Sequence, residues 1–416
     1  MRDDRGAALP AMTEEMRREF WATLALRHCR GLGVRSTARL LRHFGSALAA
    51  IGQSARWKEI GLGARAAVLA TGSWRVTARA EWDAARRSGS SIILWTDAAY
   101  PALLREICAP PSLLYCRGDL SLLHGPVLAV VGSRRCSREG REQAAALAGD
   151  LAASGLTVAS GMALGIDSAA HRAALPQVGR SIGVLGTGID VVYPAGGSDL
   201  FAAMCRGGLL ASEFAPGSPA LPGNFPVRNR IISGMARAVL VVEAEERSGS
   251  LITARAALEQ NREVYVLLGA GGSPLGAGCR QLVEDGAHPI RCARDIVRDL
   301  APQLGGQPRP DPADMLCEPA CGGAPDAAGP AGVHGAPCVP EPGCPPVPSP
   351  LPPGAPPNAE IVLRYVAAHP GCLADAVCEA TGITASGVSV AAVFLEMSGR
   401  LSRLPGGRFQ CVREQR

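Results

Sequence analysis

Lysine is nearly absent from this chain of 416 residues: Lys58 is the only one, although lysine and arginine together number 42. A P-loop nucleotide site needs a lysine at the end of its glycine-rich loop, where the ammonium group contacts the phosphates. Lys58 lies outside any such loop. The sequence therefore excludes a P-loop ATPase, helicase or recombinase.

Long apolar runs are also missing. No segment approaches the roughly 20 consecutive apolar residues that span a bilayer, so we predict no membrane insertion. The segment from Met1 to Phe20 carries acidic residues and arginines instead of the apolar stretch of a signal peptide. The 14 cysteines are scattered along the chain, and without a secretion signal we expect them to be reduced. These features predict a cytoplasmic location.

The composition is otherwise that of a globular protein. Hydrophobic residues make up 47% and charged residues 19% of the chain, so a sizeable core can form. At about 100 to 200 residues per domain the length suggests roughly two to four domains. A net charge of +5 permits binding to nucleic acid without demanding it.

Residues 14–75 predict a helical domain. Apolar residues recur at helical spacing, and the segment from Gly31 to Leu41 is typical of a helix-hairpin-helix, or SAM-like, motif. Its two glycines permit a tight turn, and free N–H groups at the start of the following helix can hold a phosphate. A helical bundle that uses the turn only for packing fits the same pattern, so both interpretations stay open.

Residues 90–300 predict an α/β domain with a Rossmann-like parallel sheet. Short β-branched or leucine-rich runs alternate with helical segments, which is typical of strands buried on both faces. The six expected strands are Val127–Val131, Leu156–Ser160, Ser181–Leu185, Leu209–Ser212, Val239–Glu243 and Val264–Leu268. We expect the segment from Ile92 to Tyr115 to pack as an extension on the first of these strands.

Residues 301–357 are dominated by Pro, Gly and Ala and predict a flexible linker. We predict no metal site in this linker, because the spacing of its cysteines and histidine fits no usual zinc ribbon. The residues concerned are Cys317, Cys321, His334, Cys338 and Cys344.

Residues 358–416 predict a winged helix. The expected elements are helices at Glu360–Ala368, Leu373–Thr381 and Ser386–Ser398, followed by a hairpin at Leu401–Val412. In a DNA reader the third helix carries basic or amide side chains, and it has none here. Phosphate contacts from arginines of the hairpin and docking to a protein are both open for this domain.

The end of the first expected strand carries an anion-binding pattern. Gly132 and Ser133 follow the strand just before a helix, and Arg134 and Arg135 add guanidinium groups that can clamp a phosphate. A dinucleotide cofactor would need Gly-x-Gly-x-x-Gly here and an acid after the next strand, and neither is present. We therefore predict no cofactor.

The end of the second expected strand is another glycine turn, from Ser160 to Asp167. Asp167 is placed to act as the N-cap of the following helix. We interpret His171, one turn later, as an ordinary histidine with satisfied hydrogen bonds. Neither residue is predicted to be catalytic.

Three further segments fall on the same edge of the sheet: Gly186–Asp190, Gly223–Arg230 and Arg247–Ala254. Ligands of open parallel sheets bind at the carboxyl ends of the strands, so these loops predict one groove rich in N–H, hydroxyl and guanidinium donors. Phe225 adds a ring on which a base of a single strand can stack.

The ordered set of motifs resembles the DNA-processing protein A (DprA/Smf) family. The resemblance is carried by Tyr100-Pro101, Arg117-Gly118-Asp119, Val131–Arg134, Ser160–His171, Gly186–Pro194, Gly223–Gly234 and Ser248–Ala254. The helical and winged-helix ends match the family's flanking domains. After the sixth strand the chain has Leu268-Gly269, where the family usually has a Pro-Gly pair.

The resemblance implies a homodimer that binds and protects single-stranded DNA and loads a RecA-type recombinase during natural transformation. It also implies that Arg134 and Arg180, the basic residue before the third strand, contact DNA. We expect Phe225 to stack a base while the other residues hold phosphates or line the groove. The expected DNA-binding residues are Gly132, Ser133, Arg134, Gly161, Gly165, Arg180, Asn224, Phe225, Arg228, Arg230, Ser248 and Ser250.

Two other functions stay open. The same superfamily looks similar to phosphoribohydrolases, whose glycine-rich motif ends in a glutamate. The nearest segment here, Ser248–Thr253, has no acid at that spacing, so general acid–base assistance is missing and we predict that the chain is not an enzyme. The third possibility is a scaffold whose end domains bind proteins.

Overall fold

The computed structural model describes residues 12–304, except 270 and 273, and parts of residues 358–411. In the second range it leaves out 370–371, 382, 384–387, 389–390, 393–394, 396–399 and 405–407. The chain divides into two compact units, one within residues 1–318 and one within 319–416. The expected linker lies outside the described residues from 305 onward, and so do its four cysteines and His334.

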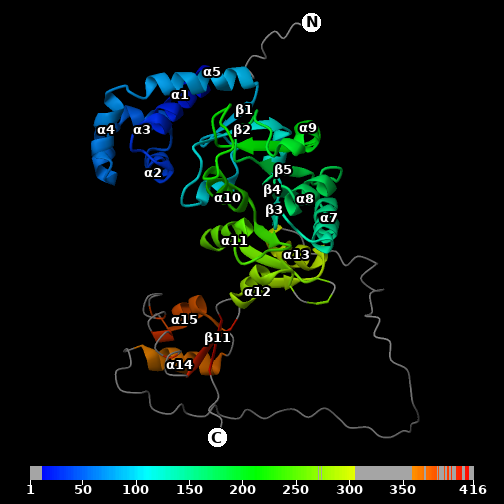
Figure 1. The fold of residues 1–416 in the computed structure, drawn as a ribbon. Coiled ribbons are helices and arrows are strands. Elements are labelled where there is room, and N and C mark those ends of the chain that lie inside the picture. Colours follow the sequence, from blue (N-terminus) through cyan, green and yellow to red (C-terminus); the bar gives the residue numbers. More distant parts are fainter. Residues whose placement is uncertain are drawn as a thin grey trace, which may run out of the picture. The chain divides into compact units, whose positions relative to one another are not determined.

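The first unit begins with a group of helices beside the sheet (Figure 1). Thr13 caps the first helix by accepting a hydrogen bond from the N–H of Met16. The buried carboxylate of Glu19 accepts the N–H groups of Ala47 and Leu48 at the start of the third helix. The elements are α1 Glu14–His28, α2 Val34–Phe44, α3 Ala47–Gly52, the 3₁₀ helix η1 Ser54–Ile60, α4 Gly63–Ala70 and α5 Arg75–Ser88.

The sequence prediction ended this helical region too early. Helix α5 runs to Ser88, thirteen residues beyond the expected boundary at 75. Its buried residues are Ala78, Glu81 and Ala85, a narrow stripe of small or polar side chains. None of the three is a large apolar side chain, and it is the repeat of large apolar side chains that marks a helix most plainly in a sequence.

A mostly parallel sheet forms the centre of the unit, which confirms the predicted α/β class. The strand order is β1-β2-β6-β5-β4-β3-β7-β8-β9, and only the β1–β2 and β2–β6 pairs are antiparallel. All five residues of β3 are buried, as expected for a strand covered on both faces. The strands are β1 Ser91–Leu94, β2 Leu113–Gly118, β3 Val127–Val131, β4 Thr157–Ser160, β5 Ser181–Val184, β6 Leu209–Ser212, β7 Ala238–Val241, β8 Glu263–Leu267 and β9 His288–Ile290.

The expected position of the N-terminal extension is wrong. Strand β2 pairs with β6, with Tyr115 opposite Ser212, and does not pair with β3. The reason is that β3 already has β4 and β7 on its two sides, whereas β6 offers the free edge of the parallel strands.

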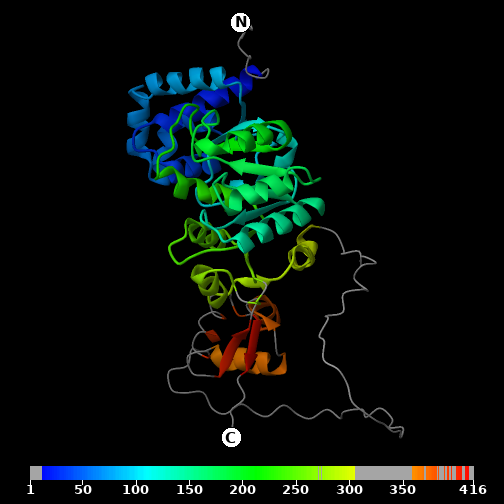
Figure 2. The same cartoon turned by 45° about the vertical axis from the view of Figure 1, so that its right-hand side comes forward.

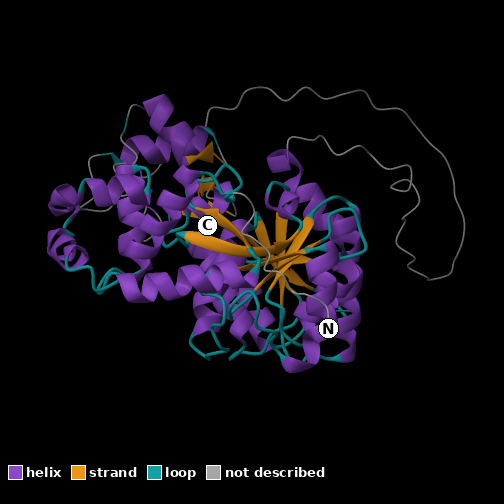
Figure 3. Ribbon diagram, turned by 90° about the horizontal axis from the view of Figure 1, so that it is seen from above, coloured by secondary structure: helices purple, strands orange, loops and turns teal. Residues whose placement is uncertain are grey.

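Helices cover both faces of the sheet (Figures 2 and 3). Leu128 and Val130 of β3 face the helices α7, α8 and α13, while Ala129 and Val131 face α10, α11 and α12. This alternation follows from the two-residue period of a strand. The helices are α6 Ala102–Glu106, η2 Leu120–Leu123, α7 Arg138–Ala153, α8 Ile166–Ala174, η3 Ala195–Gly197, α9 Ser198–Gly207, α10 Asn224–Met235, α11 Gly249–Glu259, α12 Ala277–Glu284, α13 Ala293–Leu300 and η4 Ala301–Leu304.

The second unit has its own core and a small antiparallel sheet. Val362, Val366, Leu395 and Phe409 are among its buried residues. Two helices and the hairpin agree with the winged-helix prediction, whereas most of the expected third helix, Ser386–Ser398, lies outside the described residues. The elements are α14 Ala359–Ala368, β10 Cys372–Leu373, α15 Ala374–Thr381, β11 Leu401–Leu404 and β12 Arg408–Cys411.

Two negative findings hold for the described part of the chain. None of its helices is long and apolar enough to cross a membrane. It also holds no group of three or more His, Cys, Asp or Glu side chains placed to bind a metal ion.

Candidate nucleic-acid interface

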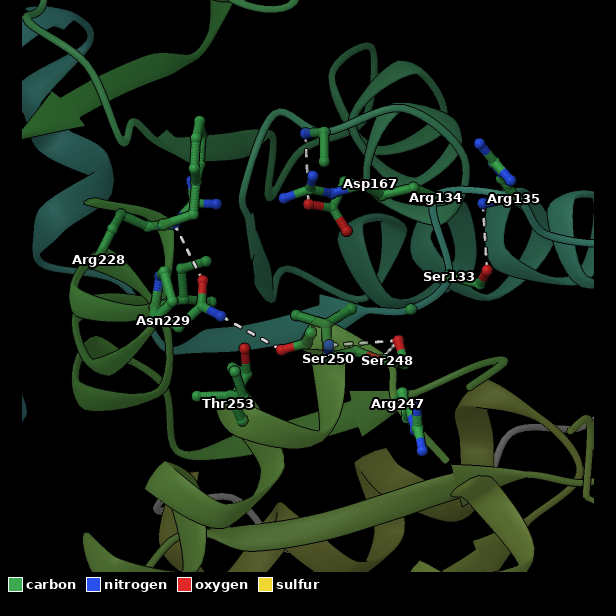
Figure 4. A pocket seen from close by; sticks show the side chains of 18 of the residues that line it. Ser133, Arg134, Arg135, Asp167, Arg228, Asn229, Arg247, Ser248, Ser250 and Thr253 are labelled. Atoms are coloured by element: carbon green, nitrogen blue, oxygen red, sulfur yellow. Dashed lines mark hydrogen bonds between the residues drawn. The ribbon is translucent and has the colours of Figure 1, made fainter. Parts of the chain in front are cut away.

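A cavity of about 670 Å³ opens at the carboxyl ends of the parallel strands. Its walls come from the loops after β3, β4, β5 and β7 and from the first turns of α10 (Figure 4). A smaller cavity of about 100 Å³ adjoins it and shares Arg134, Tyr193, Phe225 and Arg228. We call the two cavities together the groove. Its position is the one expected for a ligand of a doubly wound sheet.

The loop after β3 is held by the segment that follows β7. The N–H of Ser133 donates to the carbonyl oxygen of Glu243 at 2.8 Å. The carboxylate of Glu243 accepts from the N–H of Ser137 at 2.9 Å and from its hydroxyl at 2.6 Å. Because this acid is used to fix the loop, the exposed Arg134 and Arg135 extend from a rigid support.

The loop after β4 packs directly on this first loop. Gly165 has a φ of 78°, and a Cβ at this position would lie 2.3 Å from the carbonyl oxygen of Ser133. Only glycine fits such a close approach. The N–H of Ile166 donates to the same carbonyl at 3.2 Å, so the two loops form one surface.

Asp167 is not the N-cap that the sequence predicted. Gly165 occupies the N-cap of α8, and Asp167 is the second residue of the helix. Its carboxylate turns back and accepts the N–H groups of Gly161 at 3.1 Å and Ala163 at 3.4 Å. Burial raises the pKa of this carboxyl, and the nearby Arg228 opposes that shift. Asp167 thus shapes the loop in place of the expected capping.

His171 is fully buried behind the same loop. Its Nε2 accepts the N–H of Met162 at 3.3 Å, so its Nδ1 carries the proton and donates to the hydroxyl of Ser181 at 2.7 Å. Burial, with the charge of Arg228 adding to it, lowers the pKa of His171 to about 3. The side chain is therefore neutral at physiological pH and serves as a fixed support.

Arg228 is a buried cation at the base of the groove, with 3% of its surface exposed. Its guanidinium donates to the carbonyl oxygens of Gly161, at 2.8 Å, and Val184. Gly161 directly follows β4 and Val184 is the last residue of β5, so Arg228 joins the loops that follow the two strands. Burial lowers the pKa of Arg228 to about 10, which still leaves it charged at neutral pH.

The segment from Gly223 to Arg230 is not the loop that the sequence predicted. From Asn224 onward it is the start of α10, where the proline at position 226 is tolerated in the first turn. Asn224 donates to the carbonyl of Gly186 at 3.1 Å. The ring of Phe225 lies 5.2 Å from the ring of Tyr193, measured between their centres. The guanidinium of Arg134 lies 5.5 Å from the centre of the Phe225 ring.

The loop after β7 leads into α11 through two serines. Ser248 caps the helix, and its hydroxyl lies 2.7 Å from that of Ser250. Asn229 of α10 donates to the carbonyl of Gly249 at 3.3 Å and thereby ties the two helix starts together.

The charged side chains that line the larger cavity favour anions. The lining includes four arginines and two acids. Among the described residues, Arg134, Arg135 and Arg247 have no ion-pair partner. Arg135 was expected, with Arg134, to clamp a phosphate, whereas Tyr193 and Arg247 were not among the expected DNA-binding residues. Arg247 adjoins Ser248, so including the neighbours of each loop motif would have found it.

The structure brings most of the expected site residues together but not all of them. Those that line the groove are Gly132, Ser133, Arg134, Gly161, Phe225, Arg228, Ser248 and Ser250. Gly165 and Asn224 hold the adjoining loops in place.

Arg180 and Arg230 do not reach the groove. Arg180 precedes β5, at the amino end of the strand, and pairs with Asp119 at 2.7 Å. Arg230 pairs with the buried Glu213. The expectation that they line the groove with Arg134 is therefore wrong. For Arg180 the reason is that the two ends of a parallel strand lie on opposite edges of the sheet.

Comparisons with known proteins agree with this geometry. A sequence model of the family described as DNA recombination-mediator protein A matches residues 91–301, and one of the DprA winged helix domain matches residues 346–407. DNA processing protein DprA of Streptococcus pneumoniae is 42% identical over 204 residues, which cover 49% of this chain and 72% of that protein. Protein Smf of Escherichia coli is 46% identical over 202 residues, which cover 48% of this chain and 54% of that protein.

A solved structure gives the same result. The crystal structure of the Streptococcus pneumoniae protein matches with a TM-score of 0.58 and 33% identity. The match covers 67% of this chain and 97% of that one.

Proposed function

This chain belongs to the family of DNA recombination-mediator protein A, and on that basis we propose that it binds single-stranded DNA along the groove and delivers it to a RecA-type recombinase. In this proposal the bound strand is protected, and the process served is natural transformation in the cytoplasm. The observation that carries the proposal is the set of three arginines around the cavity that have no ion-pair partner among the described residues, next to an aromatic pair.

The groove supplies both kinds of contact that a single strand needs. Arg134, Arg135 and Arg247 are exposed and offer guanidinium groups to successive phosphates. Tyr193, which is 41% exposed, and Phe225 offer ring faces to a base. In a duplex the base faces are already stacked on one another, so this combination favours an unpaired strand.

Several expected contacts take a different role in this proposal. Arg228 and Asn224 position the loops through their hydrogen bonds to backbone carbonyls. Ser248 and Ser250 present hydroxyl groups at the start of α11. Arg180 and Arg230 are left out of the proposed DNA contacts, because both are paired with acids away from the cavities.

The proposed role involves no bond cleavage. Of the two acids that line the larger cavity, Asp167 is occupied by two backbone N–H groups and Glu245 lies at the exposed rim. A hydrolase of nucleotides would need a carboxylate free to exchange a proton with the substrate. Release of ribose 5-phosphate from nucleoside monophosphates by the purified protein would replace this proposal with an enzymatic one.

The proposed partners are a second copy of this chain and the recombinase. The family's description as a recombination mediator supports a handover of DNA to a recombinase. The homodimer rests on the family resemblance, and sedimentation equilibrium of the full chain tests it. A monomer at all concentrations would remove the dimer from the proposal and leave the groove untouched.

The proposed DNA site is tested by fluorescence anisotropy with labelled oligothymidine at 50 and 200 mM salt. The variant is Arg134→Ala/Arg247→Ala, and the control Arg206→Ala/Arg298→Ala removes two exposed arginines of α9 and α13 that line neither cavity. Each phosphate contact to a single strand contributes about 0.7 to the slope of log affinity against log salt. A variant that has lost two contacts should therefore lose about 7-fold less affinity than the wild type when the salt rises fourfold.

The control should bind like the wild type. If both variants bind like the wild type, the single strand does not lie in the groove.

A further inference from the structure

The positive charge of the protein is not evenly distributed: it is concentrated in the N-terminal helical region. Between Glu14 and Ser90 there are 14 basic and six acidic side chains, a net charge of +8, although the whole chain has only +5. The remaining residues together therefore carry −3. Two of the six acids, Glu19 and Glu81, are buried, so the surface of the helical region is more basic than the count suggests.

Five exposed cations gather around the turn between α1 and α2: Arg30, Arg35, Arg39, Lys58 and Arg65. We call this set the hairpin face. Arg30 and Arg35 flank the turn in the sequence, and Arg39 follows Arg35 by four residues on the same side of α2.

Side-chain contacts bring the other two cations to the same place. A Cβ on Gly31 would lie 2.4 Å from the guanidinium of Arg65, and the thiol of Cys29 lies 3.8 Å from the backbone oxygen of Arg65. Helix α4 therefore covers the turn. Arg39 donates to the backbone oxygen of Ile60, which places α2 against the end of η1, the element that carries Lys58.

The hairpin face has no acid that neutralises it. Among the described residues, none of the five cations forms an ion pair, and the acid next to Lys58, Glu59, is occupied by Arg56 at 3.0 Å and by His43 at 3.5 Å. A protein surface with this many unpaired guanidinium groups is suited to phosphates, which accept two parallel hydrogen bonds from each.

The aromatic residue beside Lys58 offers no surface on which a base can stack. The nearest tryptophan in the sequence, Trp57, is fully buried and donates its ring N–H to the backbone oxygen of Ala50. Single strands are held by stacking on aromatic rings as well as by charge. Duplex DNA presents only its backbone to such a face, and the α2 N-terminus, whose N-cap Gly33 has no capping side chain, adds free N–H groups.

We propose that the hairpin face is a second DNA site, which binds the sugar-phosphate backbone of double-stranded DNA without regard to sequence. This inference goes beyond the single-strand groove and does not depend on it. A protein with both sites holds a single strand next to the duplex with which it is to be paired.

The test uses the full chain, a labelled 20-base-pair duplex in two unrelated sequences, and oligothymidine, at 50 and 200 mM salt. The variant Arg30→Ala/Arg35→Ala removes two cations of the face. The control Arg17→Ala/Arg18→Ala removes the same charge from the first turns of α1, where both arginines lie near Glu14. Arg18 is ten residues before His28, or about 15 Å along the helix, which exceeds the screening length of about 8 Å at physiological salt.

The variant should bind both duplexes more weakly than the wild type and with a smaller salt dependence. Two lost contacts reduce the slope by about 1.8, so over the fourfold salt range the wild type should lose about 12-fold more affinity than the variant. The control should follow the wild type, and oligothymidine binding should stay unchanged in both. Thermal unfolding of both proteins checks that the fold is intact.

Three results would overturn the proposal. The first is duplex binding by the variant that equals that of the control. The second is loss of duplex binding in Arg134→Ala, which would place the duplex in the groove. The third is a variant that binds vesicles with about one third phosphatidylserine more weakly than the control does, while both bind the duplex equally. Anionic lipid would then be the partner. Because oligothymidine reports on the groove separately, failure of one site is distinguishable from failure of the other.

Discussion

His171 should make the folded protein sensitive to acid in a range where most carboxylates do not titrate. In the folded state burial lowers its pKa to about 3, whereas an unfolded chain protonates histidine near its ordinary value of 6.5. The unfolded state therefore binds the proton first, and stability falls as pH falls from 6.5 toward 3. At pH 7 the contribution of His171 is fully present.

The magnitude follows from the two pKa values. Between pH 7 and pH 5 the linkage relation gives a loss of about 2 kcal/mol in the free energy of unfolding. The same figure results for any folded-state pKa below about 4, so the measurement tests the burial of a neutral imidazole. Because the side chain is fully buried, solvent screening does not reduce this value.

The assay is urea unfolding of the wild type and His171→Gln at pH 7 and pH 5. Glutamine keeps an acceptor for the N–H of Met162 but does not titrate. The wild type should lose about 2 kcal/mol more than the variant between the two pH values, since the carboxylates contribute equally to both proteins. Equal losses would refute the reasoning and show that the imidazole accepts a proton in the folded state.

Three further outcomes follow from the groove. Phe225→Leu should weaken oligothymidine binding by about 1 to 3 kcal/mol, or roughly 5- to 150-fold, and unchanged anisotropy would mean that no base stacks on this ring. Gly165→Ala should lower the free energy of unfolding by more than Gly155→Ala, because both glycines have positive φ but only Gly165 meets a carbonyl oxygen at 2.3 Å; equal urea midpoints would contradict this. Arg180→Ala should leave the Kd for oligothymidine within about twofold of the wild-type value. A rise in Kd of about tenfold, which corresponds to roughly 1.4 kcal/mol of binding free energy, would mean that the strand crosses the other edge of the sheet.

The central strands could be predicted because their burial leaves a plain signal in the sequence. Val127–Val131 and Leu209–Ser212 are continuous apolar or small runs, and their expected bounds are those of β3 and β6. Strand β9 was missed, because its three residues, His288 to Ile290, include only one buried side chain. A strand at the edge of a sheet that is half exposed resembles a loop in the sequence.

The site was predicted less completely than the sheet, and the two arginines Arg180 and Arg228 show why. A sequence does not distinguish an exposed arginine from a buried one, so Arg228 was taken as a groove donor although it holds two backbone carbonyls. Arg180 was assigned from a family resemblance. Its position before the strand places it at the opposite edge of the sheet from the groove, and its contact with DNA stays a prediction.

The basic lining of the groove arises from where the acids go and not from an excess of bases, whereas the hairpin face lies in a region that has such an excess. From Val127 to Leu300 the chain has 17 basic and 16 acidic residues, and yet the groove is lined by unpaired arginines. Glu243 is used to hold Ser137, and Asp167 to hold the loop after β4. In the helical region Glu19 and Glu81 are buried in the same way.

An acid that accepts backbone N–H groups or buried donors keeps its charge, but its oxygens are held in place and do not form an ion pair with an arginine at the surface. Exposed guanidinium groups then act over the screening length of about 8 Å, even where the net charge of the region is close to zero. The hydrogen-bond partners of the acids therefore decide which arginines remain available to a phosphate. These partners are known only from the fold and not from the sequence. On this argument, neutralising Glu243 would disturb the groove by releasing the loop of Ser137, whereas neutralising an exposed acid such as Glu142, on α7 and paired with Arg138, would not.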